Sequence, residues 1–146
     1  MSFNNLGLNQ LLLDVLEKEN HKNAYPIQKQ AIPVVLKGKD VLGIAPTGSG
    51  KTASYVLPLL SKIKSDNSKK DREVAVLVLV PTRELAQQVK TVFINFAKGL
   101  PLPIKIMAVY GGVSINPQMK SLFGTSILIA RPGRLLDLVE NKAVRF

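Results

Sequence analysis

The sequence predicts an α/β fold, a parallel sheet flanked by helices, because strand-like apolar runs alternate with segments of helical periodicity. The longest run, residues 74–80, contains only valine, leucine and alanine, as expected of a parallel strand buried on both faces. Residues 104–109 and 127–129 are two further strand-like runs. A helix is predicted over 84–97, where five apolar side chains recur at helical spacing. Such alternation is typical of layered α/β domains.

The remaining elements are predicted from local signals. Two amphipathic helices are expected over residues 6–16 and 27–36, and Pro26 stands at a favourable first-turn position of the second. Another helix begins at 135–139. Residues 62–72 are rich in polar side chains and predict a surface loop rather than a domain linker.

Length and composition indicate one globular domain. The 146 residues are 46% hydrophobic, which excludes a disordered polyelectrolyte. Twenty Lys and Arg against ten acids give a net charge of +10, which favours a polyanionic partner such as nucleic acid. The sequence has no Cys, so neither a disulfide framework nor a thiolate metal site is expected. No apolar run approaches the ~20 residues of a membrane span, and we expect a soluble, cytoplasmic protein with no membrane partner.

A phosphate-binding loop is predicted between a short buried strand at residues 40–44 and a helix at 52–57. Gly48 and Gly50 allow a sharp turn, so that consecutive N–H groups point at phosphate oxygens. The start of the helix adds unpaired N–H groups and a positive dipole end. The expected ATP-binding residues of the loop are Ala45, Pro46, Thr47, Gly48, Ser49, Gly50, Lys51 and Thr52.

Two side chains of this loop carry the expected chemistry. Lys51 supplies a point charge to the phosphates, and the Thr52 hydroxyl is expected to bind Mg²⁺. The strict pattern opens with Gly where this chain has Ala45, which loosens the match. The simpler interpretation is a Gly/Ser turn that precedes a helix.

Upstream of the loop, Tyr25, Pro26, Ile27 and Gln28, followed by Ile32 and Pro33, resemble the end of the Q motif of the DEAD-box family of ATP-dependent RNA helicases. Gln28 stands seventeen residues before Ala45, the interval seen in that family. The resemblance implies that Gln28 reads the adenine edge with its amide and that Phe3 stacks on the base. The chain departs from the motif at Asn20, His21, Ala24 and Tyr25.

Three further segments resemble RNA-contacting motifs of the family, and each follows a predicted strand. Motif Ia begins with Pro81, Thr82 and Arg83, the GG motif is Gly111 and Gly112, and motif Ib, usually Thr-Pro-Gly-Arg, is Arg131, Pro132, Gly133 and Arg134. The resemblance implies contacts to the RNA sugar–phosphate backbone, without base reading. Arg134 either pairs with phosphate or braces its loop. Taken singly, each segment also fits a turn, a helix cap or a solvated arginine.

The resemblance implies a RecA-like domain. The family's Asp-Glu-Ala-Asp motif has no match, and the chain ends near the point where the strand leading to it would begin. We therefore expect 1–146 to be the N-terminal portion of RecA-like domain 1, with the Q-motif region at 1–38, the P-loop and motifs Ia, GG and Ib at 39–146, and no second RecA-like domain. Without the acidic motif and the second domain, the isolated fragment is expected to be inactive. An incomplete sheet would also expose inner strand edges, which promote association.

The resemblance thus implies an ATP-dependent RNA helicase of bacterial type that binds ATP, Mg²⁺ and single-stranded RNA and unwinds short duplexes. Lys51 and Thr52 are the expected catalytic residues. Two alternatives remain open. One is a nucleotide- and RNA-binding module without catalysis. The other is a small-molecule phosphotransferase, for which the RNA-type motifs and the positive charge have no use. The sequence identifies no protein partner.

Overall fold

The computed structural model describes residues 2–63, 74–101 and 103–146. The chain forms two compact units, one of Met1–Ile63 and Asn95–Pro101, the other of Lys64–Ile94 and Leu102–Phe146. Most of the expected polar loop at 62–72 lies outside the described residues. Among the residues that are described, no helix is both long and apolar enough to cross a bilayer.

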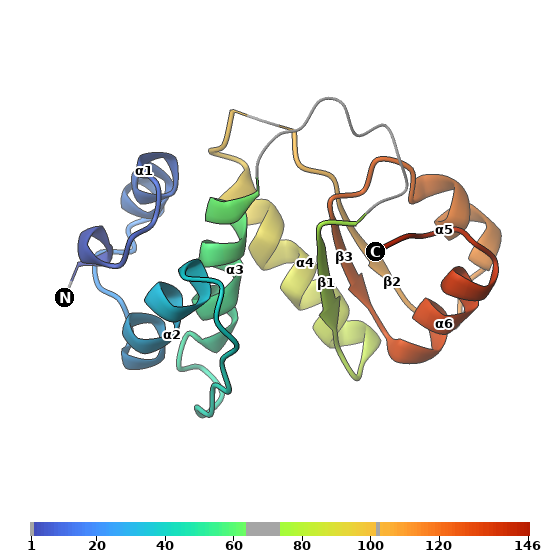
Figure 1. The fold of residues 1–146 in the computed structure, drawn as a ribbon, viewed down its shortest axis with the longest axis horizontal. Coiled ribbons are helices and arrows are strands. Elements are labelled where there is room, and N and C mark those ends of the chain that lie inside the picture. The colour runs from blue at the N-terminus through green and yellow to red at the C-terminus, as the bar shows by residue number, and fades with distance from the viewer. Residues whose placement is uncertain (1, 64–73, 102) are drawn as a thin grey trace. The chain divides into compact units, whose positions relative to one another are not determined.

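The first unit is built from helices (Figure 1). They are a 3-10 turn at Phe3–Asn5, α1 (Gln10–Lys18), α2 (Pro26–Leu36) and α3 (Lys51–Lys62). The helix expected from residue 6 begins only at Gln10, because Asn9 takes the N-cap position and its side chain accepts a hydrogen bond from the Leu12 N–H at 3.0 Å. Pro26 occupies the first turn of α2, as expected.

The core of this unit joins its helices. Helices α2 and α3 pack together, and His21 lies 5.7 Å from Phe96, measured between ring centroids. The side chains that are least exposed are Leu12, Leu16, Ile32, Val56, Leu57 and Leu60.

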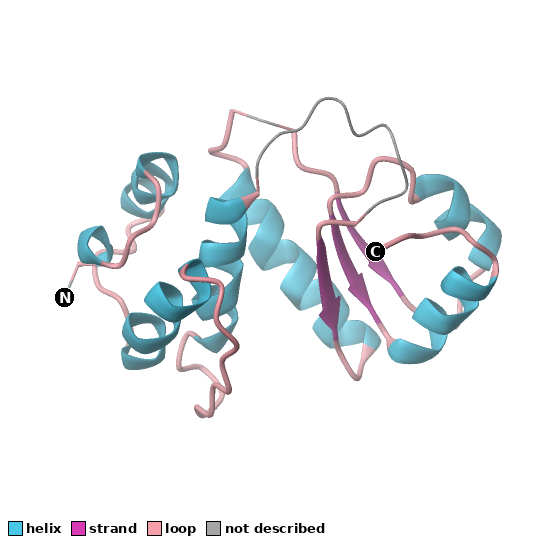
Figure 2. Ribbon diagram, viewed as in Figure 1, coloured by secondary structure: helices cyan, strands magenta, loops and turns pink. Residues whose placement is uncertain are grey.

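The buried strand predicted at residues 40–44 is wrong. Figure 2 shows the chain between α2 and α3 as loop throughout. Leu42 is 88% exposed and Ile44 is 85% exposed. A strand is stabilised by pairing and burial, and among the described residues no strand pairs with this segment. Its β-favouring sequence is therefore left without the neighbours that would make it a strand.

The second unit contains a parallel sheet in the order β1-β3-β2. Its strands are β1 (Val76–Leu79), β2 (Ile106–Val109) and β3 (Ile127–Ala130), which confirms the three later strand predictions. Ile127 of β3 pairs with Val76 on one side and with Ile106 on the other. The carboxyl ends of all three strands therefore lie along the same edge of the sheet.

Helices cover both faces of this sheet (Figure 1). Helix α4 (Arg83–Ala97) lies on one side, and α5 (Ile115–Ser121) and α6 (Pro132–Glu140) lie on the other. The predicted helices 84–97 and 135–139 correspond to α4 and α6, whereas α5 was not predicted. The core on the α5 and α6 side consists of Val74, Val109, Leu122, Leu128, Ala130, Leu138, Ala143 and Val144.

Strand β1 is less buried than its composition predicts. Leu77 and Leu79 pair with Leu128 and Ala130, so they share the face that carries the α6 core. They are nevertheless 37% and 55% exposed, whereas Leu128 and Ala130 are fully buried. The expectation that this strand is buried on both faces is wrong: β1 is one of the two edge strands of the sheet, and its residues alternate between half-buried and exposed.

Candidate functional site

The phosphate-binding loop leads directly into α3. Gly50 is the N-cap residue of this helix and has φ +81°, and Gly48 has φ +83°. Both values lie in the left-handed region that favours glycine. The first N–H groups of α3 therefore face the loop with no side-chain cap, which is the arrangement that binds anions at helix starts.

The loop side chains are arranged around this helix start. The Lys51 ammonium donates to the Ala45 carbonyl at 2.7 Å, which closes the loop from its last residues to its first. The Ser49 N–H donates to the Pro46 carbonyl at 3.2 Å. Ser49 Oγ is buried and has no hydrogen-bond partner among the described residues. A buried hydroxyl without a partner inside an anion-binding loop fits a nucleotide phosphate, and so do the open N–H groups of α3.

Gln28 connects α2 to this loop. Its side chain is 4% exposed, its Oε1 accepts from the Tyr25 N–H at 2.9 Å, and its Nε2 donates to the Gly50 carbonyl at 3.1 Å. A Cβ at Gly50 would lie 2.5 Å from Gln28 Nε2 and 2.8 Å from Tyr25 Cδ2. The structure thus brings Gln28 against the phosphate loop, and its amide retains one N–H and one lone pair for a further partner.

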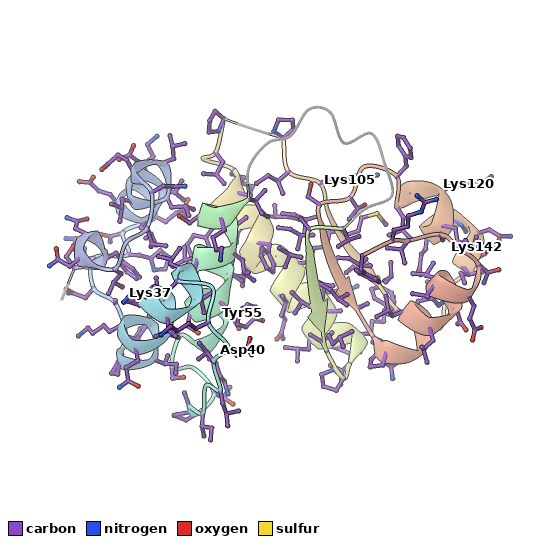
Figure 3. All side chains as sticks on the ribbon, viewed as in Figure 1. Lys37, Asp40, Tyr55, Lys105, Lys120 and Lys142 are labelled. Atoms are coloured by element: carbon purple, nitrogen blue, oxygen red, sulfur yellow. The ribbon has the colours of Figure 1, made fainter. Side chains whose placement is uncertain are left out.

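Two other expected ATP-site residues have different surroundings. Phe3 is 4% exposed, so its ring offers almost no free surface for a base. The Thr52 side chain hydrogen-bonds to Tyr55 one turn along α3, where Figure 3 labels Tyr55. Burial raises the pKa of the Tyr55 phenol above its ordinary 10.0, and the hydrogen bond from Thr52 opposes that shift. The Thr52 hydroxyl is thus a hydrogen-bond partner of Tyr55.

In the second unit, the three RNA-type segments come together. Motif Ia follows β1, the GG motif follows β2 and motif Ib follows β3, and the three strands are parallel neighbours. The segments therefore meet at the carboxyl edge of the sheet, where α/β folds bind ligands. This edge carries Pro81, Thr82, Arg83, Gly111, Gly112, Arg131, Pro132, Gly133 and Arg134.

The side chains of motif Ia contact neighbouring parts of the protein, and one of them keeps a hydrogen-bond donor for a ligand. Thr82 Oγ1 accepts from the Leu85 N–H at 3.1 Å and so caps α4, which leaves its own O–H as a donor. The Arg83 guanidinium lies over the Tyr110 ring, 4.8 Å from the ring centroid. Gln87 Nε2 donates to the hydroxyl of the same Tyr110 at 3.1 Å. Tyr110, which precedes the GG pair, therefore connects motif Ia to the GG motif.

Arg134 is turned into the protein. Its Nη2 donates to the Val113 carbonyl at 3.1 Å and its Nη1 donates to Gln118 Oε1 at 3.3 Å. Gln118 Nε2 in turn donates to the Tyr110 carbonyl at 3.2 Å. The roles of Tyr110 and Gln118 were not predicted from the sequence. The one sequence signal for Tyr110 is its position directly before the GG pair. Gln118 had no such signal, because the helix that carries it, α5, was not predicted.

The glycines of this edge are exposed to open space. A Cβ added at Gly111, Gly112 or Gly133 would meet no heavy atom within 4 Å beyond its chain neighbours. Gly112 has φ +81°, which requires a glycine-like backbone, but Gly111 and Gly133 are not forced by the protein's own packing. Glycines of that kind fit the close approach of a ligand to backbone N–H groups.

A glycine-containing loop at a helix start, closed by a lysine, together with a parallel sheet that gathers three RNA-type segments at its carboxyl edge, defines a P-loop α/β protein. The family model for the DEAD/DEAH box helicase matches residues 25–146. The chain therefore belongs to the DEAD/DEAH box helicase family.

Individual proteins agree with this assignment. The DEAD-box ATP-dependent RNA helicase CshA of Streptococcus pneumoniae is 45% identical over 146 residues, which are 99% of this chain and 27% of that relative. The crystal structure of the RNA-helicase Prp28 from Chaetomium thermophilum bound to ADP is 37% identical, with a TM-score of 0.87 over 99% of this chain and 35% of that one. The DEAD box protein from Methanococcus jannaschii has a TM-score of 0.89 at 33% identity, over 99% of this chain and 38% of that one. The fold class is thereby confirmed as RecA-like, and the chain spans about a quarter to two fifths of these proteins.

Proposed function

We propose that this chain provides the ATP-binding part and a portion of the RNA-binding surface of a cytoplasmic ATP-dependent RNA helicase, as the N-terminal portion of its RecA-like domain 1. The observation that supports this proposal most strongly is the loop before α3. There, a lysine ammonium, a partnerless buried hydroxyl and the free N–H groups of a helix start converge within eight residues, Ala45 to Thr52. Relatives named as ATP-dependent RNA helicases match the chain over almost its whole length.

The loop residues would hold ATP in defined roles. The backbone N–H groups of Gly48, Gly50, Lys51 and Thr52 would bind the phosphates, and the Lys51 ammonium would neutralise part of their charge. The Thr52 hydroxyl, a hydrogen-bond partner of Tyr55, would bind Mg²⁺, which would neutralise part of the charge on the phosphate oxygens. Within the described residues, no three His, Cys, Asp or Glu side chains are grouped to hold a metal.

Recognition of the base is proposed for Gln28 and Phe3. The free N–H and lone pair of the Gln28 amide suit the adenine edge, which presents one acceptor beside one donor. Stacking by Phe3 would require its ring to leave the buried position that it occupies here.

RNA is proposed to bind along the carboxyl edge of the sheet by its sugar–phosphate backbone. Four places along this edge offer donors that suit phosphate oxygens: the Thr82 hydroxyl, the N–H groups of Gly111 and Gly112, the Gly133 N–H that follows Pro132 in the first turn of α6, and the exposed Arg131. The positive net charge of +10 would strengthen such binding at low salt.

The test is ATP hydrolysis by the natural full-length gene product, with and without single-stranded RNA, beside a Lys51→Ala variant. Hydrolysis that RNA stimulates, that Lys51→Ala abolishes and that accompanies unwinding of a short duplex would support the helicase. Binding of both ATP and RNA without hydrolysis would favour a non-catalytic module. Hydrolysis or phosphoryl transfer without any salt-sensitive RNA binding would favour a small-molecule phosphotransferase.

A further inference from the structure

The backbone around the GG pair is fixed by side chains from two different helices. Gln118 of α5 donates to the Tyr110 carbonyl at 3.2 Å, immediately before Gly111. Arg134 of α6 donates to the Val113 carbonyl at 3.1 Å, immediately after Gly112. The two glycines are thus held by one hydrogen bond on either side. Because glycine is the most flexible residue in the unfolded chain, a loop of two glycines gains the most from such restraint.

The two side chains also bind each other. Arg134 Nη1 donates to Gln118 Oε1 at 3.3 Å, so the Gln118 amide uses its donor on the loop and its acceptor on the arginine. This chain of hydrogen bonds runs from Tyr110 through Gln118 and Arg134 to Val113.

The position of Arg134 leaves little of it for RNA. Its side chain is 11% exposed, its Nε atom is buried, and Asp137 Oδ2 lies 3.9 Å from that atom. Both terminal nitrogens already donate to groups of the protein. Arg131, three residues earlier in the same motif, is exposed at the N-cap of α6. Two arginines of one motif therefore stand in opposite environments.

We propose that Gln118 and Arg134 form a brace that sets the Tyr110–Val113 backbone for RNA, with Gln118 as a positioning residue and Arg134 as a structural partner rather than a phosphate ligand. This inference rests on the proposed RNA binding at the carboxyl edge of the sheet. The brace also fixes the backbone of Tyr110, and the Arg83 guanidinium lies over the ring of this residue. The brace therefore also affects the position of motif Ia.

The salt dependence of RNA binding separates the two arginines. Each phosphate contact to a single strand contributes about 0.7 to the slope of log affinity against log salt. Binding of a labelled single-stranded RNA would be measured over a series of KCl concentrations for the full-length protein and for Arg131→Gln and Arg134→Gln, which remove the same charge. We expect Arg131→Gln to reduce the slope by about 0.7. Arg134→Gln should weaken binding about three- to tenfold with the slope unchanged, because it removes the brace and not a phosphate contact.

Gln118→Met supplies the second arm, since it keeps the length of the side chain and removes both hydrogen bonds. It should weaken binding by a similar factor, and the double variant with Arg134→Gln should bind no more weakly than Arg134→Gln alone. Amide exchange at residues 110–113 without RNA should be faster in Gln118→Met. Asn116→Ala, an exposed change on the same helix, is the matched control and should alter none of these quantities.

Three results would overturn the brace: an equal loss of slope in both arginine variants, RNA binding and exchange in Gln118→Met that equal those of Asn116→Ala, or additive effects in the double variant. If Gln118→Met does not fold, the comparison of the two arginine slopes decides alone. Absence of salt-sensitive RNA binding by the unmodified protein is a different result, because it removes the proposed function and the inference with it.

Discussion

Gly50 and Gln28 approach each other so closely that the phosphate loop and the start of α2 form one local structure. We predict that Gly50→Ala destabilises the protein and abolishes ATP binding. The left-handed backbone alone would cost about 1–2 kcal/mol for alanine. The new Cβ would in addition lie 2.5 Å from Gln28 Nε2 and displace that amide from the Gly50 carbonyl.

Gly48→Ala is the matched control for this change. Gly48 has a similar φ of +83° but open space around its Cβ position, so only the backbone term applies. Urea unfolding would measure the free energy of unfolding of both variants, and nucleotide titration would measure their ATP affinity. Equal losses of stability would show that the contact with Gln28 contributes nothing.

Tyr55 predicts a pH dependence of stability. Its phenol has a raised pKa in the folded state, so between 10.0 and that higher value the unfolded chain loses the proton while the folded chain keeps it. The unfolded state then binds fewer protons, and the free energy of unfolding falls as the pH rises through this window. Below pH 10 the phenol is neutral in both states, and Tyr55 contributes no pH dependence.

The measurement is urea unfolding at a series of pH values around and above 10, with the phenolate absorbance recorded on the folded protein. In Tyr55→Phe, the part of the fall in the free energy of unfolding above pH 10 that comes from this phenol should be absent. A Tyr55→Phe curve with the same shape as that of the unmodified protein would contradict the assignment. Thr52→Val should raise the pKa of the phenol further, because the hydrogen bond from Thr52 lowers it.

At the level of elements, Asn9 is the N-cap residue of α1 and so sets where this helix begins. Its side chain accepts from the Leu12 N–H at 3.0 Å, and its own N–H donates to Ser61 Oγ of α3 at 3.2 Å. We predict that Asn9→Ala lowers the free energy of unfolding by about 1 kcal/mol, because it removes the N-cap. Asn9→Ser should restore most of the loss in the same thermal or urea measurement. A neutral Asn9→Ala variant would contradict the role of this cap.

The elements that could be predicted from the sequence are those whose pattern is local. Helical spacing predicted α4, an unbroken apolar run predicted β1, and shorter runs rich in isoleucine and valine predicted β2 and β3. Residues 40–44 contain three strand-compatible apolar side chains, Val41, Leu42 and Ile44, but form no strand, because strand pairing depends on neighbouring segments as well as on the segment itself. Helix α5 has seven residues and no buried side chain, which left no periodic signal to detect.

The same distinction applies to the candidate site. The phosphate loop could be located because its glycines and Lys51 are consecutive in sequence. The contacts of Arg134 with Gln118 and of Arg83 with Tyr110 join residues that lie 16 and 27 positions apart. No spacing pattern in the sequence indicates contacts of this kind. Lys105, labelled in Figure 3, shows a similar long-range role: its ammonium donates to the Ser121 and Phe123 carbonyls at the end of α5.

At the scale of the whole molecule, the free edge of β1 predicts self-association of the 146-residue chain. This edge has no neighbouring strand among the described residues, and Leu77 and Leu79 are exposed beside it. An unpaired apolar edge is a template for pairing with a second copy. We predict a concentration-dependent increase in mass by analytical ultracentrifugation, reduced by Leu79→Lys.

The control is Leu136→Lys, a similar change at a leucine that is 63% exposed on α6 rather than on a strand edge. It should leave self-association as it is. A monomeric chain with one sharp cooperative melt, unaffected by Leu79→Lys, would show that the β1 edge does not pair.

The closed state of the phosphate loop has a thermodynamic consequence. Lys51 already donates to the Ala45 carbonyl at 2.7 Å, so arrival of a nucleotide exchanges one oxygen partner of the ammonium for another. The enthalpy released on titration with ATP therefore reports the difference between these two contacts, not the full strength of the lysine–phosphate attraction. It follows that Lys51→Ala removes a contact from the ligand-free protein as well as one from the nucleotide-bound protein. Calorimetry of this variant should be read beside amide exchange at residues 45–50 in the ligand-free protein.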